Sequence, residues 1–164
     1  MRFEVLLMKP TVYIETSVLS YLTAQPSRDL VVAAHQQTTS DWWHRKRHDF
    51  DLYASQLVVL EAGRGDPEAA EKRLNVLKTL ALLETSTAAE KLAKKLLDQR
   101  IFPPKAADDA LHVGIATVNG MNYLLTWNFK HIAKAETRDA VERISRESGY
   151  EPPIICTPEE LLGE

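Results

Sequence analysis

The chain has 164 residues, 45% of them hydrophobic, and a formal net charge of −3. This length and composition predict one globular α/β domain. The negative net charge argues against a protein held on nucleic acid by a large positive field, so any nucleic-acid site must be local. The single cysteine, Cys156, excludes an internal disulfide, and no apolar run approaches the roughly 20 residues of a membrane-spanning helix. We therefore expect a cytoplasmic protein without a membrane span.

The N-terminal residues 1–10 do not form a secretory signal, because their apolar stretch is shorter than the about 7 to 15 residues required and no small-residue cleavage site follows. Met8 is an alternative start. The chain contains no internal repeat, low-complexity tract or Gly/Ser linker. We expect a single domain over residues 1–164, with its core in residues 11–160 and residues 1–10 as an N-terminal extension or first turn.

In the first half of the chain, short β-branched and aromatic runs alternate with amphipathic segments. Ser55 is placed to cap a helix that stops at Gly63 or Gly65, and Asp66 is placed to cap the next one. The expected elements are strands over residues 12–14, 50–54 and 80–83, and helices over residues 16–22, 29–47, 56–61 and from residue 66 onward.

In the second half, Thr87 and Glu90 match a capping box, and two prolines at 103 and 104 interrupt the chain before the next helix. Helices are expected over residues 87–99, 106–118 and 130–147, and strands over residues 123–126 and 153–156. Strands that alternate with helices imply a three-layer α/β/α fold with a mostly parallel central sheet. In such sheets, ligand groups lie at the carboxyl ends of the strands.

Two glutamates occupy positions where acids are not favoured. Glu15 directly follows the apolar strand at residues 12–14, where an acid is either solvated at the strand's end or faces a cleft. Glu61 closes the apolar run at residues 57–60 in the last turn of a helix, where the helix dipole disfavours negative charge. We interpret both as candidate ligand groups at the edge of the core.

Asp108 and Asp109 lie in the first turn of the helix over residues 106–118. The helix dipole favours negative charge there, so good helix design is one explanation. However, residues 110–116 are nearly all apolar or small, which predicts a helix buried around most of its circumference. Its acidic first turn is then pressed toward the interior or a cleft.

Carboxylates that gather within a few ångströms repel one another unless a cation lies between them. Hydrolysis of a phosphodiester uses a hard divalent cation such as Mg²⁺ or Mn²⁺, which prefers oxygen ligands. The sequence contains no glycine-rich phosphate loop, no Cys or His pair with zinc spacing and no nucleophile elbow. The acids therefore indicate metal-dependent hydrolysis with water as the nucleophile.

Four segments resemble motifs of the PIN-domain family, specifically its VapC-like toxin branch. They occur in the family's order and on the expected types of element, and together they span residues 12 to about 131. The segments are Tyr13-Ile14-Glu15-Thr16-Ser17, Ser55 to Glu61, Ala107-Asp108-Asp109-Ala110-Leu111-His112 and Leu124-Leu125-Thr126-Trp127-Asn128-Phe129.

The resemblance implies a ribonuclease that depends on Mg²⁺ or Mn²⁺, with a flavodoxin-like parallel sheet, an RNA substrate, a small antitoxin as partner and often a homodimer. It maps the metal-binding acids onto Glu15, Glu61 and Asp109, with Asp108 beside the third. A strand-end position that is often Asp in the family is Asn128 here. Because Glu15 stands where Asp is usual and Asn128 carries no charge, we expect one well-held ion.

The hydroxyls near these acids have two interpretations each. Thr126, at a strand end beside Asn128, either orients a ligand or water or is simply a β-branched strand residue. Thr16 and Ser17 either bind the metal site or cap the next helix, and we predict capping.

Histidines and aromatic residues are secondary candidates. His112 is predicted to be a core histidine bonded to backbone. His131 either contacts substrate phosphate or is a lone surface histidine. The basic run at residues 44–48 either tracks RNA or is a solvated helix end. Trp42 and Trp43 either stack on bases or fill an interface, and we predict that at least one is buried in the core.

Our hypothesis is an endoribonuclease toxin of a toxin–antitoxin pair, in which Glu15, Glu61 and Asp109 hold the ion and Asp108 and Asn128 support it. Two alternatives stay open. The first is a non-catalytic PIN-like module with a weakened metal site that binds RNA or an antitoxin, which the uncharged Asn128 favours. The second is another metal-dependent phosphohydrolase that acts on DNA or on a small phosphate ester.

Overall fold

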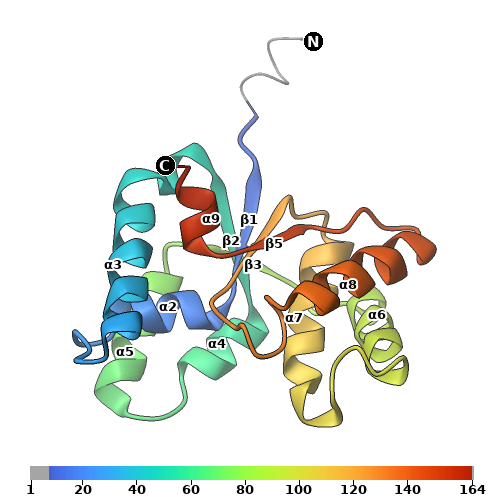
Figure 1. Ribbon diagram of the computed structural model, residues 1–164, viewed down its shortest axis with the longest axis horizontal. Helices are drawn as coiled ribbons and strands as arrows, with labels where there is room; N and C mark the ends of the chain where they lie inside the picture. Colours follow the sequence, from blue (N-terminus) through green and yellow to red (C-terminus); the bar gives the residue numbers. More distant parts are fainter. Residues whose placement is uncertain (1–7, 164) are drawn as a thin grey trace.

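The computed structural model describes residues 8–163, so the predicted N-terminal extension lies outside the described residues as far as residue 7. Its centre is a five-stranded sheet in the order β3-β2-β1-β4-β5, and every neighbouring pair is parallel (Figure 1). The strands are β1 (Thr11–Ile14), β2 (Asp51–Ser55), β3 (Ala81–Leu83), β4 (Tyr123–Leu125) and β5 (Ile154–Cys156).

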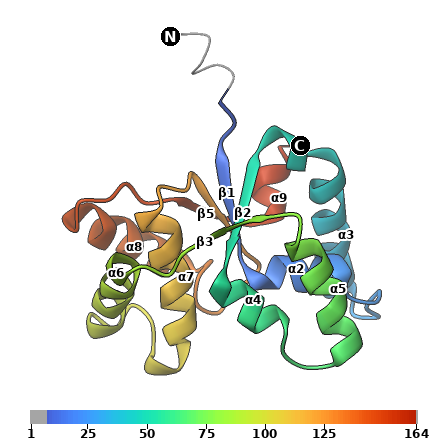
Figure 2. The ribbon, with the colours of Figure 1, turned by 180° about the vertical axis from the view of Figure 1, so that it is seen from behind.

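Helices cover both faces of the sheet, as the two opposite views show (Figures 1 and 2). One face carries α2 (Thr16–Thr23), α3 (Leu30–Arg45), α5 (Pro67–Leu77) and α9 (Pro158–Leu162), and the other carries α6 (Thr87–Asp98), α7 (Ala107–Val118) and α8 (Ala135–Glu147). The remaining elements are α4 (Gln56–Ala62) and two short 3-10 turns, η1 (Arg47–Asp49) and η2 (Pro104–Ala106). The three-layer α/β/α prediction is confirmed. No helix within residues 8–163 is long and apolar enough to cross a membrane.

The central strand, β1, is completely buried along its apolar run: Val12, Tyr13 and Ile14 are 0% exposed. It pairs with β2 on one side and with β4 on the other. The chain builds β2 and β3 outward in one direction and β4 and β5 in the other, so the order of the strands reverses beside β1. Such a reversal leaves a crevice at the carboxyl ends of the two strands concerned.

Two helices start at their predicted caps: Ser55 accepts a hydrogen bond from the backbone N–H of Val58, and Asp66 accepts one from Ala69. Asp29 also acts as a cap, because its side chain accepts the N–H groups at the start of α3. One predicted cap is wrong: Ser86, rather than Thr87, is the N-cap of α6. Ser86 has the extended backbone that an N-cap needs, and its side chain accepts the N–H of the residue three positions on, so the residue after it is already helical.

Two further predictions in the C-terminal third need correction. The helix expected from residue 130 begins at Ala135, because the carbonyl oxygen of Asn128 accepts the N–H groups of Ile132 and Ala133 in a non-helical turn. A further helix, α9, was not predicted, although Thr157 and Glu160 form a reciprocal capping box at its start. This helix packs against α3 and covers the sheet beside β5.

The helix that carries the paired aspartates, α7, is buried around most of its surface, as predicted. It packs closely on α6 at Gly114: a Cβ built there would lie 2.4 Å from the carbonyl oxygen of Ala89. Since Ala89 belongs to the backbone of α6, a side chain larger than hydrogen would push the two helices apart. Gly114 therefore fixes the spacing at which α7 lies against its neighbour.

We expect Gly114→Ala to lower the free energy of unfolding by about 1 to 3 kcal/mol, the usual cost of adding a methyl group to a packed contact. Alanine in an open helical position would instead be favourable by about 1 kcal/mol. Gly63→Ala is the matched control, because its Cβ would meet Val59 O at an ordinary 3.4 Å. Urea unfolding of the three proteins measures the difference, and equal stability of Gly114→Ala and the parent would show that the helices are not in tight contact.

Candidate active site

Glu15 lies at the carboxyl end of β1 and is almost fully buried, with 5% of its surface exposed. Its backbone N–H donates to the carbonyl oxygen of Leu125 at 3.1 Å, which holds it between β1 and β4. Its Oε1 accepts hydrogen bonds from Thr126 Oγ1 at 2.7 Å and from Ser17 Oγ. The alternative of a solvated acid at a strand end is therefore wrong for this side chain.

The hydroxyls at the start of α2 bind carboxylates, so the prediction that they cap this helix is wrong. Thr16 Oγ1 donates to Glu61 Oε1 at 2.5 Å. Ser17 Oγ donates to Glu15 and accepts the backbone N–H of Trp127 at 2.8 Å. The physical reason is position: Glu15 occupies the N-cap, so both hydroxyls already lie inside the helix and face the acids.

Glu61 lies in the last turn of α4 and is bound by a buried histidine from α7. His112 Nε2 is 2.6 Å from Glu61 Oε1 and His112 Nδ1 is 2.7 Å from the hydroxyl of Tyr13. Tyr13 in turn shares a 2.7 Å hydrogen bond with Ser55 Oγ, at the cap of α4. His112 is buried as predicted, but its partners are side chains rather than backbone, so that part of the prediction is wrong.

This histidine and Glu61 shift each other's protonation. Burial alone would raise the pKa of Glu61, but the hydrogen bond and charge of His112, with the hydroxyl of Thr16, lower that pKa below its ordinary value. Burial alone would lower the pKa of His112, but the hydrogen bond that it donates to Glu61 and the charges of Glu15, Glu61 and Asp109 raise this pKa above its ordinary value. The folded protein thus favours an ionised carboxylate beside a protonated imidazole.

Asp109 lies in the first turn of α7 and is half-buried. Burial raises its pKa, a hydrogen bond from the Asn128 side chain acts in the opposite direction, and the charge of Glu15 raises it further, so that the pKa lies above its ordinary value. Asn128 Oδ1 accepts the backbone N–H of His131 at 3.0 Å, so this residue ties Asp109 to the turn after β4. His131 lies close enough for its charge to act on Asp109.

The predicted site residues are therefore not equivalent. Glu15, Glu61 and His112 each have one atom that can bind a metal ion, and these three atoms lie within 4.8 Å of one another. Asp109 is close enough to interact electrostatically with Glu15 and His112. Asp108, by contrast, is exposed at the surface of α7, with no shared contact to this group among the described residues. His112 is the group that sequence reasoning undervalued; its place three residues after Asp109 on a buried helix was the available signal.

Two other sequence features lie elsewhere. The basic run at residues 44–48 is at the end of α3 and in η1, which lead into the start of β2, where Asp51 donates its N–H to Pro10 O. That is the amino-terminal end of the sheet, opposite the acids. Trp42 is fully buried, as predicted, and the guanidinium of Arg47 lies 4.1 Å from the ring centre of Trp43.

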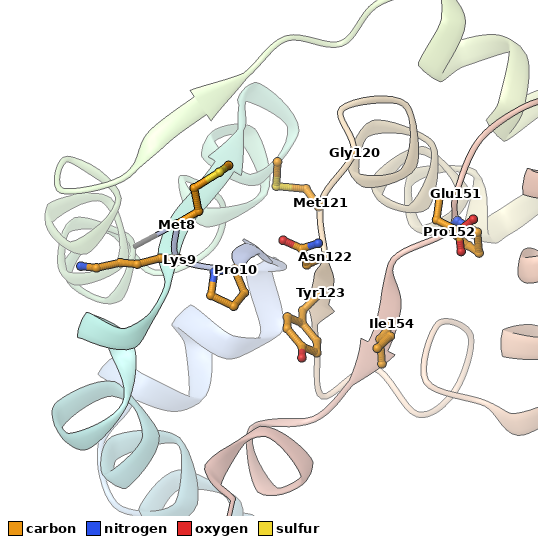
Figure 3. A pocket seen from close by; sticks show the side chains of 10 residues that line it. All are labelled: Met8, Lys9, Pro10, Gly120, Met121, Asn122, Tyr123, Glu151, Pro152 and Ile154. Carbon is orange, nitrogen blue, oxygen red and sulfur yellow. The ribbon is translucent and has the colours of Figure 1, made fainter. Parts of the chain in front are cut away.

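A cavity of about 700 Å³ also lies at the amino-terminal ends of β1, β4 and β5 (Figure 3). Its lining includes Lys9, Asn122 and Ile154. The strands run from this cavity toward the acids, so the two features are at opposite ends of the sheet and the cavity does not belong to the candidate site.

The His112–Glu61 pair predicts a pH dependence of stability in the presence of chelator. A histidine whose pKa is raised in the folded state contributes stability below its ordinary value of 6.5, and this is lost as the pH rises through the raised value. We therefore expect the free energy of unfolding to fall as the pH increases from about 6 to about 9. Urea unfolding across this range checks it. Glu61→Gln should make the fall smaller, since the charges of Glu15 and Asp109 remain. His48→Asn at an exposed position should leave the fall as it is, and an unchanged slope in Glu61→Gln would contradict the pairing.

Comparison with known proteins gave solved structures only: no family model matches the chain, and no curated protein sequence matches it. The Mycobacterium tuberculosis VapC20, described as a toxin that cleaves the sarcin-ricin loop, superposes with a TM-score of 0.58 and 16% identity, covering 74% of this chain and 93% of its own. VapBC2 from Rickettsia felis, bound to a DNA fragment from its promoter, gives a TM-score of 0.56 at 13% identity, covering 90% and 98%.

DNA-bound VapBC from Salmonella typhimurium is a further match, with a TM-score of 0.52 at 13% identity, covering 92% of this chain and 99% of the other. Likeness at such low identity establishes the fold. The five-stranded parallel sheet between two helical layers is common to these structures and to this chain. The chain therefore has the PIN-like α/β/α fold of the VapC proteins, as its four sequence motifs predicted.

Proposed function

We propose that the chain is a metal-dependent endoribonuclease whose ion is held by Glu15, Glu61 and Asp109. The observation that carries this proposal is that Glu15, directly after β1, and Glu61, on α4, bring carboxylate oxygens within 4.8 Å of each other at the carboxyl end of the sheet, where the strand order reverses. Asp109, on α7, is near enough for the charge of Glu15 to act on its pKa. Buried acids at such a point are expensive unless they bind something positive.

The donor set fits Mg²⁺ or Mn²⁺, since it is built of carboxylate oxygens. Among the described residues, the hydrogen bonds to Glu15 and Glu61 all go to Oε1 of each, which leaves Oε2 for a ligand. Glu61 is paired with His112, and the charge of Arg64 also acts on it. The ion pairs of Lys and Arg described within residues 8–163 involve other acids. We propose that a divalent cation balances the remaining negative charge, that of Glu15 and Asp109.

His112 is better assigned to holding Glu61 than to holding the ion. Both of its ring nitrogens already have partners, Tyr13 and Glu61, so it would have to give up one of these bonds to become a ligand. Groups that bind the outer side of a ligand fix its orientation and are worth about 10- to 100-fold in metal affinity. In the same way Ser17 and Thr126 hold Glu15.

A bound divalent ion supplies charge neutralisation at the phosphate and a lower pKa for the attacking water. The residues of the chain fix the position of the ion. Asn128 holds Asp109 and the turn that carries His131. We propose that the His131 side chain contacts a substrate phosphate. Asp108 is exposed and supports the site only through its negative charge near α7's first turn.

The proposal extends to the protein's partners. The similar structures from Rickettsia felis and Salmonella typhimurium are VapBC complexes bound to DNA. By analogy of fold alone, we propose that this chain is the toxin of such a pair, that a small antitoxin protein binds it, and that it acts as a homodimer in the cytoplasm. A reading frame beside the gene that encodes a small DNA-binding protein would support this.

Cleavage of RNA by the purified protein is the direct test. Structured and unstructured RNA are incubated with Mn²⁺, Mg²⁺ or chelator, with single-stranded DNA in parallel. We expect cleavage of RNA only with metal, and a fall of about 100-fold or more in Asp109→Asn and Glu61→Gln, because loss of a ligand removes several kcal/mol of stabilisation.

Asp108→Asn is the matched control: it removes the same charge one residue away, at an exposed position, and should stay within about 3-fold of the parent, as expected for a surface acid. Equal cleavage by the parent, Asp109→Asn and Glu61→Gln would refute the site. RNA binding without cleavage in any metal would favour the non-catalytic module, and preferential cleavage of DNA would favour the other phosphohydrolase.

A further inference from the structure

Four aromatic rings pack together beside the candidate active site, and we call them the aromatic cluster. Trp127 is almost fully buried and stacks on His35, with ring centres 4.1 Å apart and planes 17° from parallel. Tyr21 lies 5.8 Å from Trp127. Phe129 packs on His35 at 5.9 Å and on Trp127 at 6.0 Å. The cluster joins α2, α3 and the segment that follows β4.

The aromatic cluster is connected to the acids by hydrogen bonds. The backbone N–H of Trp127 donates to Ser17 Oγ, and that hydroxyl donates to Glu15. The next residue, Asn128, bonds Asp109 through its side chain. Phe129 follows immediately, on the segment that runs past the carboxyl end of the sheet (Figure 1). Two members of the cluster, Trp127 and Phe129, therefore flank Asn128 in the chain.

Phe129 is the exposed member of the aromatic cluster, at 50%. Its backbone is nevertheless held in a turn, since its N–H donates to Trp127 O at 2.9 Å and the carbonyl of Asn128 accepts two further N–H groups. Trp127 below it is fixed by a 2.7 Å hydrogen bond from its Nε1 to Thr39 Oγ1. The ring thus rests on a rigid support while much of its surface stays open, so a planar ligand could bind with little further ordering.

We propose that Phe129, supported by His35, is a stacking subsite for one unpaired nucleobase of the RNA whose phosphate lies at the carboxylates. The proposal rests on the proposed function for that phosphate. Single-stranded RNA is recognised by splaying a base onto an aromatic ring, whereas the bases of a duplex have no free face. Lys130 is exposed next to Phe129, so a cationic side chain lies beside the ring where the RNA backbone would pass.

A protein partner is the competing occupant of this surface. Leu30 and Val31, at the start of α3, are 86% and 64% exposed and lie one turn or so before His35. These side chains are aliphatic, and an aliphatic surface suits a protein better than a base. The position of Phe129 next to the proposed phosphate site, and the aromatic character of every ring beneath it, favour the nucleobase.

The test measures binding of short single-stranded RNA by fluorescence anisotropy of the labelled RNA, with Mg²⁺ present to hold the phosphate at the carboxylates and at times before cleavage, and in chelator as a second condition. The variants are Phe129→Ala, Phe129→Leu, which keeps an apolar group, and Phe129→Tyr, which keeps the ring. Ile154→Ala is the matched control, since Ile154 is 59% exposed at the other end of the sheet. The same proteins are also assayed with RNA of equal length made of abasic nucleotides.

We expect the Kd to rise about 10-fold in Phe129→Ala and Phe129→Leu, the scale of one base stacked on one ring, and to stay within about 2-fold in Phe129→Tyr and Ile154→Ala. With abasic RNA, all proteins should bind equally weakly. Thermal unfolding by circular dichroism verifies that each variant is folded.

Unchanged binding in Phe129→Ala, or an equal loss with abasic RNA, would overturn the subsite. So would unchanged RNA binding with an altered oligomeric state on gel filtration, because Phe129 would then belong to a protein interface.

The cleavage assay with Mn²⁺ separates this proposal from the proposed function. If the parent cleaves RNA and the Phe129 variants bind normally, the subsite is wrong and the ribonuclease stands. If the parent binds RNA in a ring-dependent way and never cleaves it, the subsite stands and the ribonuclease is wrong. If the parent neither binds nor cleaves RNA, both are wrong.

Discussion

The parallel pairing of β1 with β2 on one side and β4 on the other is the constraint on which the site depends. Since the chain builds outward in opposite directions from β1, the helices that leave the strands diverge and open a crevice at their carboxyl ends. Glu15 lies there because it is the first residue after β1, and its N–H bond to Leu125 sets it against β4. Glu61 and Asp109 enter from helices that start at the same edge of the sheet.

Gathering acids in that crevice requires partners that reach them from inside the protein. Hydroxyls from α2 and from the end of β4 bind Glu15, and His112 and Thr16 bind Glu61. In a partly buried setting these charge-assisted hydrogen bonds are stronger than neutral ones, and each also removes a rotational freedom of the carboxylate. The polar side chains therefore stabilise the fold and orient the acids at once, so their effects on stability and on activity are coupled.

Much of the fold follows from local patterns, and less of the site does. Short stretches of sequence are enough to predict the strand at residues 12–14, the cap at Ser55 and the buried α7. Hydrophobic periodicity and helix capping depend only on residues that are close together in the chain. Thr16 and His112 bind Glu61, which lies tens of residues away in sequence, and Ser17 accepts the N–H of the equally distant Trp127, so only the sheet order brings these groups together. A capping hydroxyl and a ligand-binding hydroxyl look alike until that order is known. The same holds for residues 130–134, where the Asn128 carbonyl competes with a helix start.

The charge of the chain bears on how it would hold RNA. The net charge of the chain is −3, and its basic run at residues 44–48 lies at the opposite end of the sheet from the acids. A phosphate backbone would gain little from long-range attraction here, so binding must come from short-range contacts. A cation between the carboxylates is one such contact, and an exposed ring on a rigid aromatic support is another, because stacking depends little on the protein's net charge. The two together would let an acidic protein select an unpaired stretch of RNA.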